Sequence, residues 1–141
     1  MRRYLIVAHR TLGDEHLIEH VRALREEGPC RFLLLIPVYH PGHMWSDGEV
    51  NAAARIKLQE GLDRFHDEGI IADGEIGDAN PVYAVSTVVR REGPGAFTGI
   101  VLSTLPPGPS RWLHWDVPSR MRKEHPRLPL THLVADRIPA H

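Results

Sequence analysis

Residues 31–38, RFLLLIPV, form the apolar run that decides the fold class. Similar runs stand at residues 4–8 (YLIVA) and 99–102 (GIVL). Because their apolar residues are continuous rather than alternating with polar ones, each run is typical of a strand buried on both faces. Such strands occur in parallel sheets that helices cover on both sides. The runs therefore predict an α/β protein with a parallel sheet.

Three segments with helical periodicity separate these runs, and each has a start signal and a stop signal. The first segment starts at Asp14 and stops at Gly28-Pro29. The second starts with the capping box at residues 46–49 and stops at Gly69, and the third starts at Asn80-Pro81 and stops at Gly93. The apolar positions of each segment share one helical face. They are Leu17, Ile18, Val21 and Leu24, then Val50, Ala54, Leu58, Leu62 and Phe65, then Val82, Val85, Val88 and Val89.

Two more strands and a short helix complete the pattern. Residues 70–76 begin apolar and then alternate, and residues 131–135 (THLVA) form an apolar run near the end of the chain. A helix is predicted at residues 117–124, with Asp116 as its cap and Pro118 in its first turn. Strand and helix thus alternate throughout, which predicts one doubly wound, three-layer domain over all 141 residues. We expect a five-stranded parallel sheet in the order 3-2-1-4-5.

Composition and charge exclude several classes of protein. The apolar fraction of 42% and the charged fraction of 25% are those of a folded globular domain. The net charge is −1 and the basic residues are dispersed, so neither nucleic acid nor an anionic membrane is an expected partner. Cys30 is the only cysteine, which excludes an internal disulfide. The apolar runs are too short for a membrane span or a secretory signal, so we expect a cytoplasmic protein.

The sheet order indicates where a ligand would bind. In open α/β sheets ligands bind at the carboxyl ends of the strands, where the strand order reverses. Here that crevice lies between the first and fourth strands, bordered by residues 9–13 and by residues 103–111. We expect Arg10 and Arg111 to supply charge. The hydroxyls of Thr11, Ser103, Thr104 and Ser110 would supply hydrogen bonds, and Ala8 and Val38 would form an apolar floor for a ring. The candidate binding residues are Ala8, His9, Arg10, Thr11, Val38, Ser103, Thr104, Gly108, Ser110 and Arg111.

Structural explanations compete with binding in this loop. The prolines could simply stiffen a crossover, and Arg111 could pair with an acid on the next helix. Trp112 and Trp115 are three residues apart and share a face on a helical turn. Stacking on a base is one role for them, but covering the core or a dimer contact is the favoured one.

Metal binding and catalysis have weaker support. His40, His43 and Asp47 could surround a metal, but ten histidines make chance pairs common, and no metal site is assigned. His9 with Ser103 or Ser110 could form a nucleophile and base. The chain has no Gly-x-Ser-x-Gly elbow, so no catalytic residue is assigned, and a small nucleotide hydrolase is the third hypothesis.

The fourth predicted strand ends in Leu102-Ser103-Thr104, and a glycine-containing loop and a short helix follow it. Together with the succession of elements and the length of the chain, this pattern resembles the universal stress protein family. The resemblance covers nearly the whole chain. It implies the adenine nucleotide alpha hydrolase-like fold, and it implies a homodimer paired through the last strand, as in many members.

One branch of that family binds ATP through a motif in the loop after strand four. In this motif two residues separate the first two glycines, nine residues separate the second and third glycines, and Ser or Thr follows the third glycine. Laid on this chain, the motif falls on Ser103, Pro106, Asp116 and Val117, so every position departs. His9 also stands where the ATP binders have an aspartate. Proline offers no N–H to a phosphate, and Asp116 would repel one. The chain therefore resembles a divergent branch that lacks the ATP-binding glycines.

The resemblance and these departures together imply a non-catalytic, stress-response-type domain that binds a nucleotide or a small anion. The cofactor is not identified, and ATP and AMP are the candidates. The alternative is a ligand-free dimerisation or interaction module, whose tryptophans and last strand contact a partner. In that module the prolines and Asp116 close the crevice.

Overall fold

The computed structural model describes residues 1–38, 47–108 and 110–135, with the backbone alone at 47–51. In these ranges five parallel strands form one sheet in the order β3-β2-β1-β4-β5. The predicted order 3-2-1-4-5 is therefore confirmed. The strands are β1 (Arg2–Val7), β2 (Cys30–Pro37), β3 (Ala72–Gly77), β4 (Gly99–Thr104) and β5 (Leu130–Val134).

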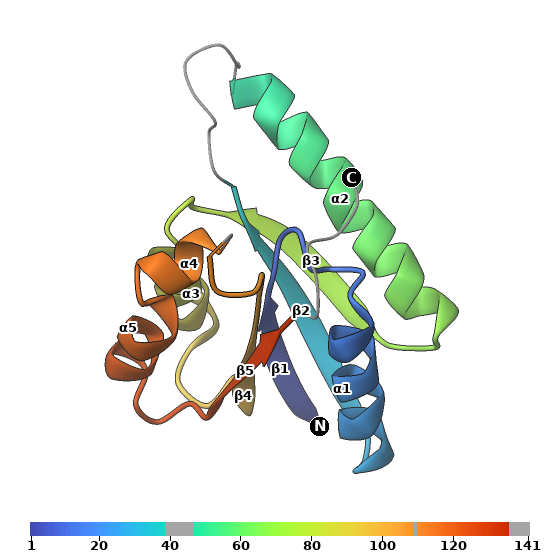
Figure 1. Cartoon of the computed structure of the whole chain (residues 1–141). Coiled ribbons are helices and arrows are strands. Elements are labelled where there is room, and N and C mark those ends of the chain that lie inside the picture. Colours follow the sequence, from blue (N-terminus) through green and yellow to red (C-terminus); the bar gives the residue numbers. More distant parts are fainter. Residues whose placement is uncertain (39–46, 109, 136–141) are drawn as a thin grey trace.

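Helices cover both faces of the sheet and complete the predicted three layers (Figure 1). One face carries α1 (Glu15–Glu26) and α2 (Asp47–Asp67), and the other carries α3 (Pro81–Glu92), α4 (Arg111–His114) and α5 (Val117–Glu124). Within the described ranges, none of these helices is both long and apolar enough to cross a lipid bilayer.

Successive side chains of the central strands enter two different cores. Ile6 and Leu34 pack under α1 and α2, whereas Leu5 and Leu33 pack under α3 and α5. All four side chains are buried. Because side chains alternate across a strand, a strand covered on both faces needs apolar residues at every position. This requirement explains the continuous runs in the sequence.

The third strand begins later than the sequence predicts. β3 starts at Ala72 rather than at Ile70, because Gly69 adopts a left-handed φ of 75° and the N–H of Ile70 bonds the carbonyl of Phe65. Ile70 is buried in the core under α2, while Ile71 is half exposed. The apolar start of this segment therefore belongs to the turn that ends α2.

Of the three predicted N-caps that lie within the described residues, two form as expected. The carboxylate of Asp14 accepts a hydrogen bond from the N–H of His16, and the Asn80 side chain accepts from Val82 and Tyr83. Asp116 occupies the N-cap position of α5, but its side chain makes no capping bond and its φ is 53°. Its N–H instead bonds the carbonyl of Leu113, because α4 ends directly before it. The predicted side-chain cap is thus wrong.

A short helix that the sequence did not define precedes α5. α4 contains only four residues, and its N-cap is Ser110.

Two other predicted features fall partly or wholly outside the described residues. The capping box at residues 46–49 begins outside them, and both His40 and His43 lie outside them. Among the described residues, no three histidine, cysteine or acidic side chains gather as a metal ion would need.

Candidate functional site

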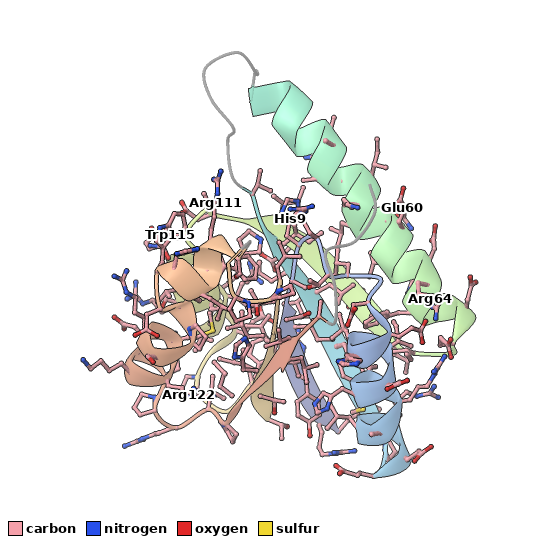
Figure 2. The ribbon with its side chains drawn as sticks, in the orientation of Figure 1. His9, Glu60, Arg64, Arg111, Trp115 and Arg122 are labelled. Carbon is pink, nitrogen blue, oxygen red and sulfur yellow. The ribbon has the colours of Figure 1, made fainter. Side chains whose placement is uncertain are left out.

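A cavity of about 390 Å³ opens at the carboxyl edge of the sheet, between the ends of β1 and β4. It lies in the size range of small-molecule sites, about 300–1,000 Å³. Figure 2 shows His9 at the same end of the molecule as Arg111 and Trp115, which come from the α4 segment. The lining residues are His9, Arg10, Thr11, Pro37, Ala79, Ser103, Thr104, Leu105, Ser110, Arg111, Trp112 and Trp115.

A buried pair of hydroxyls fixes the base of the cavity. The Ser103 hydroxyl donates to Thr11 Oγ1 at 2.6 Å, and the Thr11 hydroxyl donates to the Ser103 carbonyl at 3.3 Å. Each residue is only 1% exposed. These bonds hold the loop after β1 against the end of β4, so the cavity is formed before any ligand enters. They also engage both hydroxyl protons, which a phosphate would otherwise accept.

The other two candidate hydroxyls also have structural roles. Thr104 Oγ1 lies 2.8 Å from His132 Nε2 on β5, in a hydrogen bond that joins β4 to β5. Burial, with a smaller effect from Arg122, lowers the pKa of His132 and so favours its neutral form. Ser110 Oγ accepts the N–H of Leu113 and caps α4. Among the described residues the Ser110 hydroxyl proton has no acceptor, so it can donate to a ligand.

The charged side chains that line the cavity are all basic or titrate to a cation. They are His9, Arg10 and Arg111, and the described lining contains no carboxylate. Arg10 is exposed and forms no ion pair within the described residues. Burial lowers the pKa of His9, and the nearby Lys57 and Arg10 lower it further. The cavity is therefore electropositive and suits an anionic group.

Apolar side chains form a further wall of the cavity. Trp112 packs against the core under α3 and α5, as the sequence favoured, but it also borders the cavity. Trp115 is 44% exposed and lines the same cavity, so its indole is accessible to a ring. Pro37, Ala79 and Leu105 complete this wall, and the sequence analysis had assigned no role to them. Pro37 ends β2, Leu105 directly follows β4, and Ala79 comes two residues after β3, so their places at the carboxyl ends of strands were the available signal.

Three candidates lie outside the cavity lining. Ala8 and Val38 are buried in the core under α1 and α2, because their side chains point to that face of the sheet. Gly108 is exposed with a φ of 99°, and its carbonyl lies 2.8 Å from His114 Nε2. Asp116 is likewise absent from the lining, so neither it nor Pro106 closes the crevice.

Asp78 and Cys30 each have a structural explanation. The carboxylate of Asp78 accepts the N–H of Asn80 at 2.9 Å, next to the cap of α3. Cys30 is buried at the amino end of β2, at the edge opposite the cavity, and burial raises the pKa of its thiol. Neither feature indicates chemistry at the site.

No known family model matches this sequence, and no curated protein matches it. Solved structures share its fold. A universal stress protein family protein from Arabidopsis thaliana, crystallised with AMP bound, is 14% identical and aligns over 96% of this chain and 93% of its own, with a TM-score of 0.63. A protein of the same family from Burkholderia pseudomallei is 12% identical over 93% of this chain and 94% of its own, with a TM-score of 0.56. At these identities the likeness shows the fold, which is that of universal stress proteins.

Proposed function

We propose that this chain is a cytoplasmic, non-catalytic, stress-response-type domain that binds a nucleotide or another small anion in the cavity between β1 and β4. The main support is the lining, which pairs three cationic or titratable side chains with two tryptophans and contains no carboxylate among the described residues. The Arabidopsis protein of the same fold was crystallised with AMP bound, which makes AMP the first ligand to test.

The arrangement favours one anionic group over a chain of phosphates. Pro106 and Pro107 have no N–H, so the backbone there cannot cradle several phosphates. The protons of Thr11 and Ser103 are already engaged. Recognition of the anion is left to the side chains of His9, Arg10, Arg111 and Ser110. We therefore expect AMP to bind more tightly than ATP.

The same contacts weigh against hydrolysis. The Ser103 hydroxyl donates to Thr11 rather than to an imidazole, so it is not activated as a nucleophile. The Ser110 oxygen accepts a backbone N–H, which lowers its nucleophilicity further. These engagements support a binding role over the hydrolase hypothesis.

AMP binding is the first prediction. At a concentration of one hundred times its Kd, AMP should raise the free energy of unfolding by about 2.7 kcal/mol. Calorimetric titration and thermal unfolding measure the two quantities independently. Ala79→Trp should abolish the effect by filling the cavity, whereas Ala53→Trp on the exposed side of α2 should retain it. If no nucleotide co-purifies, and AMP, ATP and phosphate all leave the thermal stability unchanged, the ligand-free module replaces this proposal.

We also propose that two copies pair through β5. Among the described strands, β5 lies at an edge of the sheet and pairs only with β4, and Val134 on it is 36% exposed. An unpaired edge offers backbone groups to a second copy. The chain should therefore elute with about twice its mass of 15.9 kDa in light scattering. Val134→Lys should yield monomers and Val134→Thr should not; a monomeric wild-type chain would contradict the pairing.

A further inference from the structure

His9 is the titratable side chain that the end of β1 brings to the cavity. Its backbone follows Ala8, whose N–H bonds the Leu35 carbonyl of β2 at 3.3 Å. The same loop is fixed to β4 by the hydroxyl pair of Thr11 and Ser103. His9 is partly buried, and it borders the cavity opposite the α4 segment (Figure 2). Its imidazole is thus held at the wall where a ligand would contact it.

The charged groups around this imidazole are cations. Lys57 approaches from α2, Arg10 lies beside it in the same loop, and Arg111 borders the cavity from α4. The parts of β2, β4 and the segment before α3 that line the cavity contribute no charged group. The acidic residue closest to His9 in the sequence, Asp14, uses its carboxylate to cap α1. Without an anionic ligand, a protonated His9 would lack a negative partner among the described residues.

This environment lowers the pKa of His9 and so favours its neutral form. Burial and the two neighbouring cations all lower its pKa below 6.5. An anion entering the cavity offsets the positive potential of these cations, because it brings the negative charge that the described lining lacks. The imidazolium then gains a charge-assisted hydrogen bond in place of a repulsion.

We propose that an anionic ligand enters this cavity together with a proton, which His9 takes up from solvent, so that the affinity for anions depends on pH. This inference rests on the proposed function and names its regulation. No covalent bond is made or broken, and the bound state carries one proton more than the free protein and free ligand together. His9 is therefore a residue that determines specificity for anions, and acidification strengthens binding.

Linkage fixes the direction and the size of the effect. A ligand that raises the His9 pKa binds more tightly as pH falls. Protonation of His9 raises the affinity for the ligand by the same factor by which the ligand raises the affinity of His9 for the proton. Between the pKa of free His9 and that of the complex, the affinity changes by about tenfold for each pH unit. Above this interval the affinity levels off at its weaker value.

The test requires an anion that keeps its charge over the pH range. The phosphate of AMP loses charge near pH 6, so its sulfate analogue, adenosine 5′-sulfate, is the better probe, with AMP beside it. Calorimetry in two buffers of different ionisation enthalpy gives both the Kd and the number of protons taken up. The Kd should be about tenfold lower at about pH 5.5 than at about pH 7.5. Proton magnetic resonance of the His9 ring should show its pKa rising when the probe binds.

His9→Gln should bind the probe with a Kd that varies by less than about twofold over this range, without proton uptake. The matched control is His20→Gln on α1, where burial also lowers the histidine pKa but the side chain does not line the cavity. It should retain the pH dependence. If His9→Gln is unstable, the ring resonance of the wild-type protein still decides the matter.

Each alternative outcome overturns a defined part of the argument. Binding at one Kd throughout, or equal proton uptake by His9→Gln, overturns the coupling and leaves the proposed function intact. Failure of the wild-type protein to bind either probe at any of these pH values overturns both. An unchanged ring pKa in a saturated complex overturns the coupling alone.

Discussion

Replacing Phe65 with alanine is expected to lower the free energy of unfolding by about 3–5 kcal/mol, the range for a large buried aromatic side chain. Phe65 is fully buried on α2 and lies in a T-shaped arrangement with the Phe32 ring, with centroids 6.4 Å apart and planes at 90°. Phe32 in turn stacks on Tyr4 at 5.9 Å. The three rings join α2 to β2 and β1, and urea unfolding measures the loss.

The control for this variant lies on the same helix. Ile56 is 62% exposed, so Ile56→Ala should change the free energy of unfolding by no more than about 0.5 kcal/mol. The comparison separates the loss of packing from the change in helix propensity, because both variants place the stronger helix former alanine in α2. A loss below about 1 kcal/mol for Phe65→Ala would contradict its central place in the core.

Phe65 also shows how much of the fold the sequence could predict. It occupied one position of a helical apolar face, and that periodicity placed α2 against the sheet correctly. β1, β2 and β4 were equally clear, because strands buried on both faces need uninterrupted apolar residues. β3 gave a weaker pattern since it is an edge strand and most of its side chains are only partly buried. Its boundary was therefore displaced to the apolar turn at Ile70.

The position of the candidate site followed from topology, but its chemistry did not. The order of the strands placed the crevice between β1 and β4, and the cavity lies there. The hydroxyls of Thr11 and Ser103 bond each other although they are 92 positions apart in the chain, a pairing no local pattern reveals. Trp115 borders the cavity because a four-residue helix, α4, turns the chain there. Such a helix is too short to give a periodic signal.

Reversing the charge at Arg10 is expected to weaken AMP binding about 10- to 100-fold, since a hydrogen bond between charged groups is worth about 1.5–3 kcal/mol. Arg10 lines the cavity, is exposed, and forms no ion pair within the described residues. Arg10→Glu therefore removes a cation from the ligand without breaking a described ion pair. Calorimetric titration with AMP gives the change in Kd, and urea unfolding should show almost unchanged stability.

Arg31→Glu is the matched control, because it makes the same change in net charge at the opposite edge of the sheet. Arg31 is exposed near the start of β2, whereas Pro37 at the end of β2 borders the cavity. Six residue-to-residue steps along the strand place them about 20 Å apart, more than twice the Debye length of about 8 Å at physiological salt. Its Kd for AMP should therefore stay near the wild-type value. Equal weakening in both variants would mean that AMP responds to the overall charge of the protein, and an unchanged Kd in Arg10→Glu would remove this cation from the site.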